Sequence, residues 1–175
     1  MKSFEDLAAL RRSCRTYTDE DISSDDVRLI LRAALMSPTS RGRQSWHFVV
    51  VDDRLLLEKL SDVKESGAKF LGKAALAVVV LGDSLQNDCW IEDCSAAALS
   101  MQLQAEDLGL GSCWVQIRGR GLSDGTSADD VVHGVLDIPD NFKVLCVIGF
   151  GHKAEYKQPH DDDTLKWENV HINGF

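Results

Sequence analysis

Four apolar runs separated by helix-like stretches are the feature that most limits what this chain can fold into. The runs cover residues 46–52, 74–82, 112–117 and 142–149, and they are rich in the apolar, β-branched and aromatic side chains that favour strands. A chain in which strands alternate with helices predicts a mixed α/β or α+β domain. The 175 residues, of which 44% are hydrophobic, are enough for one domain with a sizeable core.

Apolar residues at helical spacing fill the segments before and between these runs. They predict helices over residues 4–11, 24–35, 55–63, 88–108 and 128–135. The second and fifth helices follow a serine that has an aspartate three residues later, which is the spacing of a capping box. Asn87 or Asp88 is the expected cap of the long fourth helix, and Gly109 is its expected end. Small residues at 95–98 would let another helix approach it closely.

The charge balance disfavours several classes of partner. With 28 acidic and 19 basic residues the formal net charge is −9, which disfavours nucleic acid and an anionic membrane surface. Residues 1–20 are highly charged and lack the apolar core of a signal peptide, and the longest apolar run is too short to span a bilayer. We therefore expect a cytoplasmic protein that binds neither nucleic acid nor membranes.

The five cysteines show neither CxxC nor zinc-ligand spacing, so we expect reduced thiols and no metal site. Cys113 and Cys146 lie in apolar runs and are expected to pack in the core. Cys14 stands between arginines, and it is the one thiol whose neighbours suggest a lowered pKa. A thiol enzyme that uses Cys14 is therefore one of the functional alternatives.

A small basic cluster stands out in this acidic chain. Residues 11–15 read Arg-Arg-Ser-Cys-Arg, and Thr16 and Tyr17 follow. Guanidinium groups this close repel one another unless an anion neutralises them, and guanidinium and hydroxyl groups suit a phosphate. On this motif alone, a phosphate-bearing ligand and a solvated basic turn are both open. There is no GxGxxG fingerprint after the first strand and no P-loop, so we do not expect a nucleotide-binding fold of the usual kind.

Several segments in order and spacing resemble the nitroreductase family of flavin mononucleotide (FMN) dependent oxidoreductases. They are the opening RRSCRTY, the loop SPTSRGRQSW before WHFVVV, the turn DLGLGSCW, the turn LDIP and the strand VIGFGHK. The resemblance implies an α+β fold with a central, mainly antiparallel sheet flanked by helices. It also implies a homodimer in which the tail, about residues 153–175, embraces the partner subunit as an exchanged arm.

The resemblance also implies a set of cofactor-binding residues. They are Arg11, Arg12, Ser13, Arg15, Pro38, Thr39, Ser40, Gln44, Val115, Gln116, Gly151, His152 and Lys153. The basic segment would hold the phosphate, the ribityl chain and the ring edge of FMN, with Arg15 near the N1/O2 edge. The loop from residue 38 would come from the partner subunit. Backbone groups at 115 and 116 would reach N5 and O4, and residues 151–153 would close the phosphate end.

Three positions depart from the family pattern. Gly42 and Ser45 stand where the family has asparagine and proline, and His160 stands where many members have an arginine after a proline. A contact to the flavin ring and one phosphate ligand are therefore expected to be missing, with Lys153 as a possible replacement for the latter. The apolar Val170-His171-Ile172 near the end of the tail suggests a strand added to a partner.

Two functions from different classes follow. The first is an oxidoreductase that takes hydride from NADH or NADPH and reduces a nitroaromatic, quinone or enone-type acceptor in a ping-pong cycle. On this interpretation the flavin does the chemistry, and no side chain is assigned as catalytic. The second is a flavin-binding sensor or carrier without turnover, which the three departures keep open.

Overall fold

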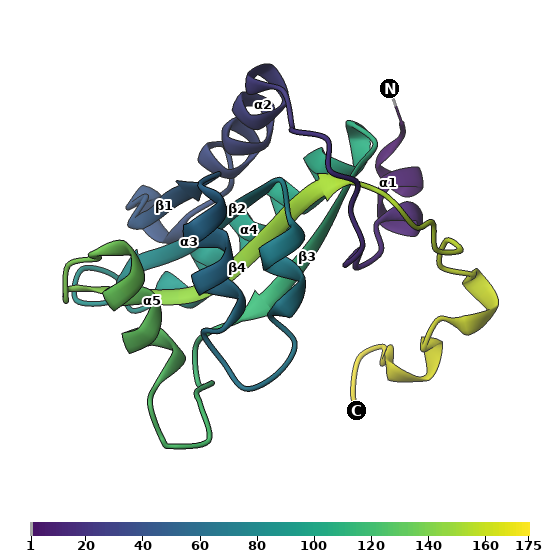
Figure 1. Cartoon of the computed structure of the whole chain (residues 1–175). Coiled ribbons are helices and arrows are strands. Elements are labelled where there is room, and N and C mark those ends of the chain that lie inside the picture. Colours follow the sequence, from purple (N-terminus) through teal and green to yellow (C-terminus); the bar gives the residue numbers. More distant parts are fainter. Residues whose placement is uncertain (1) are drawn as a thin grey trace.

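The computed structural model describes residues 2–175, which fold into an antiparallel sheet with helices on both faces (Figure 1). The helices are α1 (Phe4–Leu10), α2 (Ser24–Leu35), α3 (Arg54–Ser61), α4 (Trp90–Asp107) and α5 (Ala128–Leu136). The strands are β1 (Trp46–Val51), β2 (Leu76–Asp83), β3 (Leu110–Gln116) and β4 (Phe142–His152), in the spatial order β1-β2-β4-β3. The predicted α+β class with an antiparallel sheet is confirmed.

Burial of the strands follows their place in the sheet. All eight residues of β2 are buried, as are eight consecutive residues of β4, because both strands lie in the centre and are covered on both faces. The prediction that the 46–52 run is a buried strand is only half right. It forms the edge strand β1, where His47 and Val50 are exposed. An unbroken apolar run without alternation gives no signal that the strand will lie at an edge of the sheet.

Two separate apolar layers hold the helices against the sheet. Helices α2 and α4 cover one face, where Ile30 and Met101 pack with Ile148 of β4. Helices α3 and α5 cover the other face, where Leu57 packs in a cluster with Val147 of β4. Neighbouring residues of β4 thus point to opposite layers, as the pleat of a strand requires.

The cap predicted for the long helix is wrong. Helix α4 begins at Trp90 after a cap at Cys89, and Asn87 lies buried one turn earlier. The Asn87 side chain accepts from Cys89 N and donates to Ser45 Oγ at 2.9 Å and Asp93 Oδ2 at 2.7 Å. Asn87 therefore joins the helix start to the loop before β1 rather than capping the helix.

The tail leaves the body beyond β4 and runs past α1, as Figure 1 shows. It contains two short 3-10 helices, Asp162–Thr164 and Trp167–Asn169. His160 N donates to Ala9 O at 2.9 Å, which fastens the beginning of the tail to the end of α1. Within this chain residues 170–172 are not a strand, and Ile172 is 82% exposed. No helix within residues 2–175 has the length and apolarity needed to cross a membrane.

Candidate functional site

The basic segment after α1 is docked along the outer edge of β3. Cys14 N donates to Ser112 O at 2.9 Å, and Ser13 and Ser112 form a parallel bridge. Further on, Thr18 N donates to His152 O at 3.0 Å. Backbone hydrogen bonds therefore hold the 11–15 segment against the edge of the sheet.

Tyr17 anchors the end of this segment in the core. Its hydroxyl lies 2.8 Å from Cys14 O and 3.1 Å from Gly149 O. A Cβ at Gly151 would come within 2.7 Å of the Tyr17 ring. Gly151, expected from the resemblance to close the phosphate end, thus serves first to make room for this aromatic ring.

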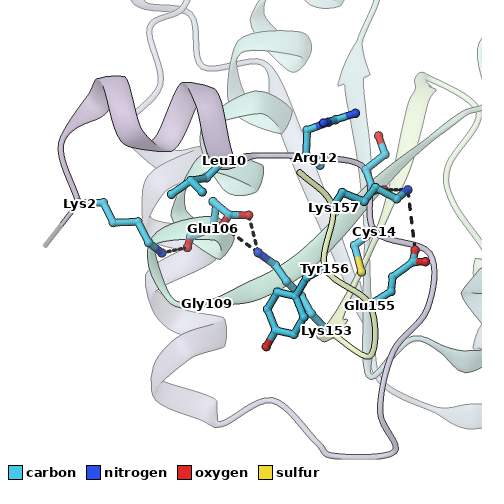
Figure 2. Close-up of a pocket in the computed structure, with 11 residues that line it drawn as sticks. Lys2, Leu10, Arg12, Cys14, Glu106, Gly109, Lys153, Glu155, Tyr156 and Lys157 are labelled. Atoms are coloured by element: carbon cyan, nitrogen blue, oxygen red, sulfur yellow. Dashed lines mark hydrogen bonds and ion pairs between the residues drawn. The ribbon is translucent and has the colours of Figure 1, made fainter. Parts of the chain in front are cut away.

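A cavity of about 290 Å³ lies beside the segment (Figure 2). Its lining comprises Lys2, Leu10, Arg12, Ser13, Cys14, Glu106, Gly109, Lys153, Glu155, Tyr156 and Lys157. Three of the expected cofactor residues, Arg12, Ser13 and Lys153, therefore meet at one place. Four cations and two carboxylates line the cavity, which leaves an excess of positive charge in a protein that is acidic as a whole.

Arg12 and Lys157 tie the segment to the beginning of the tail. The Arg12 guanidinium donates to Gln158 O, and Lys157 Nζ donates to Ser13 O at 2.6 Å. Both acceptors are neutral carbonyls, and each cation has further N–H donors. Sequence reasoning missed Lys157, although a second lysine four residues after Lys153 was a readable signal.

Lys153 lines the cavity, but its charge is already paired. Its Nζ lies 2.8 and 2.7 Å from the two carboxylate oxygens of Glu106, which is in the last turn of α4. Lys2 Nζ donates to the Glu106 carbonyl oxygen at 2.6 Å. Glu106 gave no signal in the sequence, because nothing local indicates that the end of α4 meets the end of β4.

Three other expected cofactor residues, Arg11, Arg15 and His152, lie near the cavity but do not line it. Arg11 and Arg15 are on the same segment but outside the cavity lining, with Arg15 exposed. The His152 ring faces residues 20–21, with Nε2 3.3 Å from Asp21 O and Nδ1 3.9 Å from Glu20 Oε2. The structure therefore does not place His152 with the cavity residues.

Cys14 lacks the features of a reactive thiol. It is 4% exposed, and its Sγ lies 3.3 Å from Thr16 O. Burial raises the pKa of Cys14 from its ordinary value and outweighs the neighbouring lysines, Lys153 and Lys157, which lower it. The prediction that arginine neighbours lower this pKa is wrong, and the geometry does not favour a thiol enzyme.

The loop before β1 is built around a buried aspartate. Asp93 accepts from Ser40 N at 2.8 Å and from Asn87 Nδ2 at 2.7 Å. Within the loop, Thr39 Oγ1 accepts from Gln44 N at 3.2 Å, and Gln44 adopts a positive φ of 51°. Pro38 is exposed. The expected contact residues of this loop are thus held in a defined shape by hydrogen bonds.

This loop lies at the opposite end of the sheet from the cavity. Ser40 binds Asp93 and Lys153 binds Glu106, which are thirteen residues apart on α4. At the rise of an α-helix this separation is roughly 20 Å. Within one chain the structure therefore does not bring Pro38, Thr39, Ser40 and Gln44 together with Arg12, Ser13 and Lys153.

On β3 the structure separates the two expected backbone contacts. Val115 is fully buried among the residues that face α3 and α5. Because Ser112 O faces the 11–15 segment, alternation along the strand turns the backbone groups of Trp114 and Gln116 outward and those of Val115 toward β4. Gln116 is therefore placed to offer backbone groups at the edge, whereas the backbone groups of Val115 face β4.

Comparisons with known proteins point to one family. The sequence model of the Nitroreductase family matches residues 8–80 and 63–152. A protein from Archaeoglobus fulgidus, provisionally named NADH dehydrogenase/NAD(P)H nitroreductase, is 35% identical over 166 residues, which cover 92% of each chain.

Solved structures give the same result. An FMN-dependent nitroreductase from Clostridium difficile R20291 is 41% identical, with a TM-score of 0.96 over 98% of this chain and 100% of that chain. A structure from Bacteroides thetaiotaomicron, provisionally named NADH dehydrogenase/NAD(P)H nitroreductase, is 33% identical, with a TM-score of 0.89 over 98% of this chain and 97% of that chain.

Proposed function

The chain belongs to the nitroreductase family of oxidoreductases, and we propose that it is an FMN-dependent enzyme. NADH or NADPH would be the electron donor, and a small nitroaromatic, quinone or enone-type molecule the acceptor. Bound FMN would supply the hydride chemistry of a ping-pong cycle, while the protein binds and orients the reactants. This proposal needs no side chain as a general acid or base.

The observation that carries the proposal is the cation-lined cavity beside residues 11–15. The phosphate of FMN is a compact anion, and guanidinium and ammonium groups are its usual ligands. A cavity of about 290 Å³ is at the lower limit for ligand pockets. It therefore suits the phosphate end, and the rest of the flavin would extend along the segment.

Different residues of the segment would then contact different parts of FMN. Arg12 and Lys157 have uncommitted donors for the phosphate, and Ser13, whose carbonyl oxygen accepts from Lys157, also lines the cavity. Arg11 and Arg15, outside the cavity, would face the ribityl chain and the ring edge. A cation near the N1/O2 edge stabilises a reduced, anionic flavin.

A complete site would require two copies of the chain. A flavin anchored in the cavity would extend along the 11–15 segment, whereas the loop with Pro38, Thr39, Ser40 and Gln44 of the same chain is fastened to the other end of α4, roughly 20 Å away along the helix. Exposed apolar side chains on α2 and α4, among them Leu29, Leu35 and Leu99, offer a surface for a second copy. We therefore propose a homodimer in which this loop comes from the partner.

The first test is the visible absorption spectrum of the purified protein, followed by anaerobic addition of NADH or NADPH. A flavin spectrum that bleaches and recovers with an electron acceptor is the expected result. A colourless protein that does not take up added FMN would contradict the proposal.

A flavin-binding sensor or carrier without turnover is the second candidate. It is favoured by the pairing of Lys153 with Glu106 and by His160, whose exposed side chain lies outside the cavity lining, so that neither replaces the missing phosphate ligand. A bound flavin that neither NADH nor NADPH reduces would support this function against the first.

A further inference from the structure

The cavity contains a cation whose charge is neutralised within the protein. Lys153 is held by both carboxylate oxygens of Glu106, and the two side chains are only 13% and 7% exposed. Figure 2 shows this pair in the cavity lining. A carboxylate this buried is tolerated only when its charge is paired, so the contact is a built part of the fold.

The position of Glu106 in the chain fixes the carboxylate in place. It lies in the last turn of α4, where the helix dipole is negative and favours nearby cations. Lys2 Nζ donates to the Glu106 carbonyl oxygen at 2.6 Å and Lys153 approaches the side chain. Both lysines therefore stabilise this helix end, and Lys153 has little reason to leave it for a ligand.

Arg12 and Lys157 differ from Lys153 and Lys2, because the latter two are held at the negative C-terminal end of α4. Their partners within the cavity are the backbone carbonyls Gln158 O and Ser13 O, which carry no net charge. Glu155 is 3.8 Å from Lys157, a half-exposed pair of the kind that contributes little. The charges of these two residues remain available to an anion.

We propose that Glu106 is a positioning residue that limits how strongly the cavity holds a phosphate. By keeping Lys153 in an ion pair, it withholds one cation from the ligand and leaves Arg12 and Lys157 as the phosphate partners. Glu106 thereby determines how well the site discriminates FMN from riboflavin, which lacks the phosphate. This inference rests on the proposed function, with the phosphate end of FMN as the ligand in the cavity.

The test compares dissociation constants of FMN and riboflavin for full-length, flavin-free protein, measured by quenching of flavin fluorescence. Glu106→Gln keeps the size and a hydrogen-bonding oxygen but releases the Lys153 charge. We expect this variant to bind FMN about tenfold more tightly, the scale of one charge-assisted hydrogen bond, with riboflavin binding unchanged.

Two further variants separate this effect from simple electrostatics. Asp107→Asn removes the same charge one residue later on the helix and should change the ratio of the two constants less than about twofold, because it leaves the ion pair intact. Glu106→Gln combined with Lys153→Met should return FMN binding to near the wild-type value, since the released cation is then absent.

The inference is overturned if folded Glu106→Gln leaves the FMN-to-riboflavin ratio unchanged, if Asp107→Asn has an equal effect, or if the gain persists in the double variant. If wild-type protein binds FMN in any of these cases, the proposed function stands. If none of the proteins binds FMN, both the proposed function and this inference fail.

A measurement on the wild type alone covers the case in which a variant does not fold. Acetylation of lysines, followed by mass spectrometry with and without FMN, should find Lys153 unreactive in both conditions. Lys157 should be reactive in the free protein and protected by FMN. A reactive Lys153 that FMN protects would show that it is a phosphate ligand and would overturn the inference.

Discussion

Charged side chains near the two ends of α4 differ in whether their charge is satisfied within the protein. At its start, buried Asp93 has two hydrogen-bond donors, Ser40 N and Asn87 Nδ2, and the loop before β1 is shaped around it. Beside its end, Arg12 and Lys157 face a cavity, where each donates to a neutral carbonyl and Lys157 also lies 3.8 Å from the half-exposed Glu155 carboxylate. The first end is a scaffold whose polar groups are satisfied, and the second keeps charge available for a ligand.

The largest expected effect comes from removing the tail, which begins at the cavity end. In a chain that ends at Ala154, the exposed Trp167, Val170 and Ile172 are lost. If these side chains are buried against a partner in the proposed homodimer, their loss should weaken dimerisation by roughly 3–5 kcal/mol. Analytical ultracentrifugation of the full and shortened chains measures this. A shortened protein that stays dimeric and keeps its flavin would refute the exchanged arm.

Breaking the scaffold end should reduce stability without weakening phosphate binding. Asp93→Ala leaves Ser40 N–H and the Asn87 amide without their acceptor in a buried site, and we expect a loss of about 3 kcal/mol in the free energy of unfolding. Urea denaturation measures this loss, and Asp93→Asn, which keeps an acceptor oxygen, should lose less. Equal stability of Asp93→Ala and wild type would contradict this description.

Removing a cation from the cavity end should weaken phosphate binding without reducing stability. Arg12→Ala should weaken FMN binding by about 1.5–3 kcal/mol, the scale of hydrogen bonds to charged groups, and should leave riboflavin binding unchanged. Titration of flavin fluorescence measures both. Lys59→Ala, which removes an exposed cation from α3, is the matched control and should change neither constant. An unaltered FMN dissociation constant in Arg12→Ala would remove Arg12 from the site.

A smaller effect is expected from the packing that supports the cavity end. In Gly151→Ala the new Cβ would meet the Tyr17 ring at 2.7 Å, so the backbone has to shift. Overpacking of this kind costs about 1–3 kcal/mol of stability. Gly134→Ala is the control, because it lies in α5 with no heavy atom within 4 Å, and alanine should stabilise that helix. Thermal unfolding should show a lower Tm for Gly151→Ala and a higher Tm for Gly134→Ala than for the wild type.

The smallest effect concerns the thiol next to Asp93. Burial raises the pKa of Cys94 to about 12, whereas the thiol of the unfolded chain ionises near its ordinary pKa of 9.0. Because the pKa is higher in the folded state, the neutral Cys94 thiol contributes fully to the free energy of unfolding below pH 9. This contribution falls by about 1.4 kcal/mol per pH unit as the pH rises from 9 toward 12. Urea unfolding at pH 7 and pH 10 should show a smaller difference for Cys94→Ala than for wild type. Identical differences would contradict this assignment.

Local sequence patterns predicted the elements well, because strand and helix formation depend on short-range periodicity. Helices α2 and α5 begin after Ser23 and Ser127, as their capping sequences predict. Where prediction was wrong, the reason lies in distant contacts. Asn87 bonds to Ser45 and Asp93 instead of capping the helix. Two residues of the first strand, His47 and Val50, are exposed because nothing pairs with its outer edge within residues 2–175.

Prediction of the candidate site was less complete. The basic segment was evident from its composition, and the structure brings Arg12 and Ser13 together with Lys153. Glu106 and Lys157 were missed, since their positions depend on α4, β4 and the tail meeting at one point.

The succession of strands and helices, the basic segment and the family resemblance can all be read from the amino-acid sequence, because they depend on residue type and spacing along the chain. Which charges are free depends on the folded arrangement. Arg12, Lys153 and Lys157 carry the same formal charge, but Lys153 alone is neutralised by a buried carboxylate. The physical reason is that the electrostatic role of a side chain depends on its neighbours and its burial, and folding brings those neighbours from distant parts of the chain.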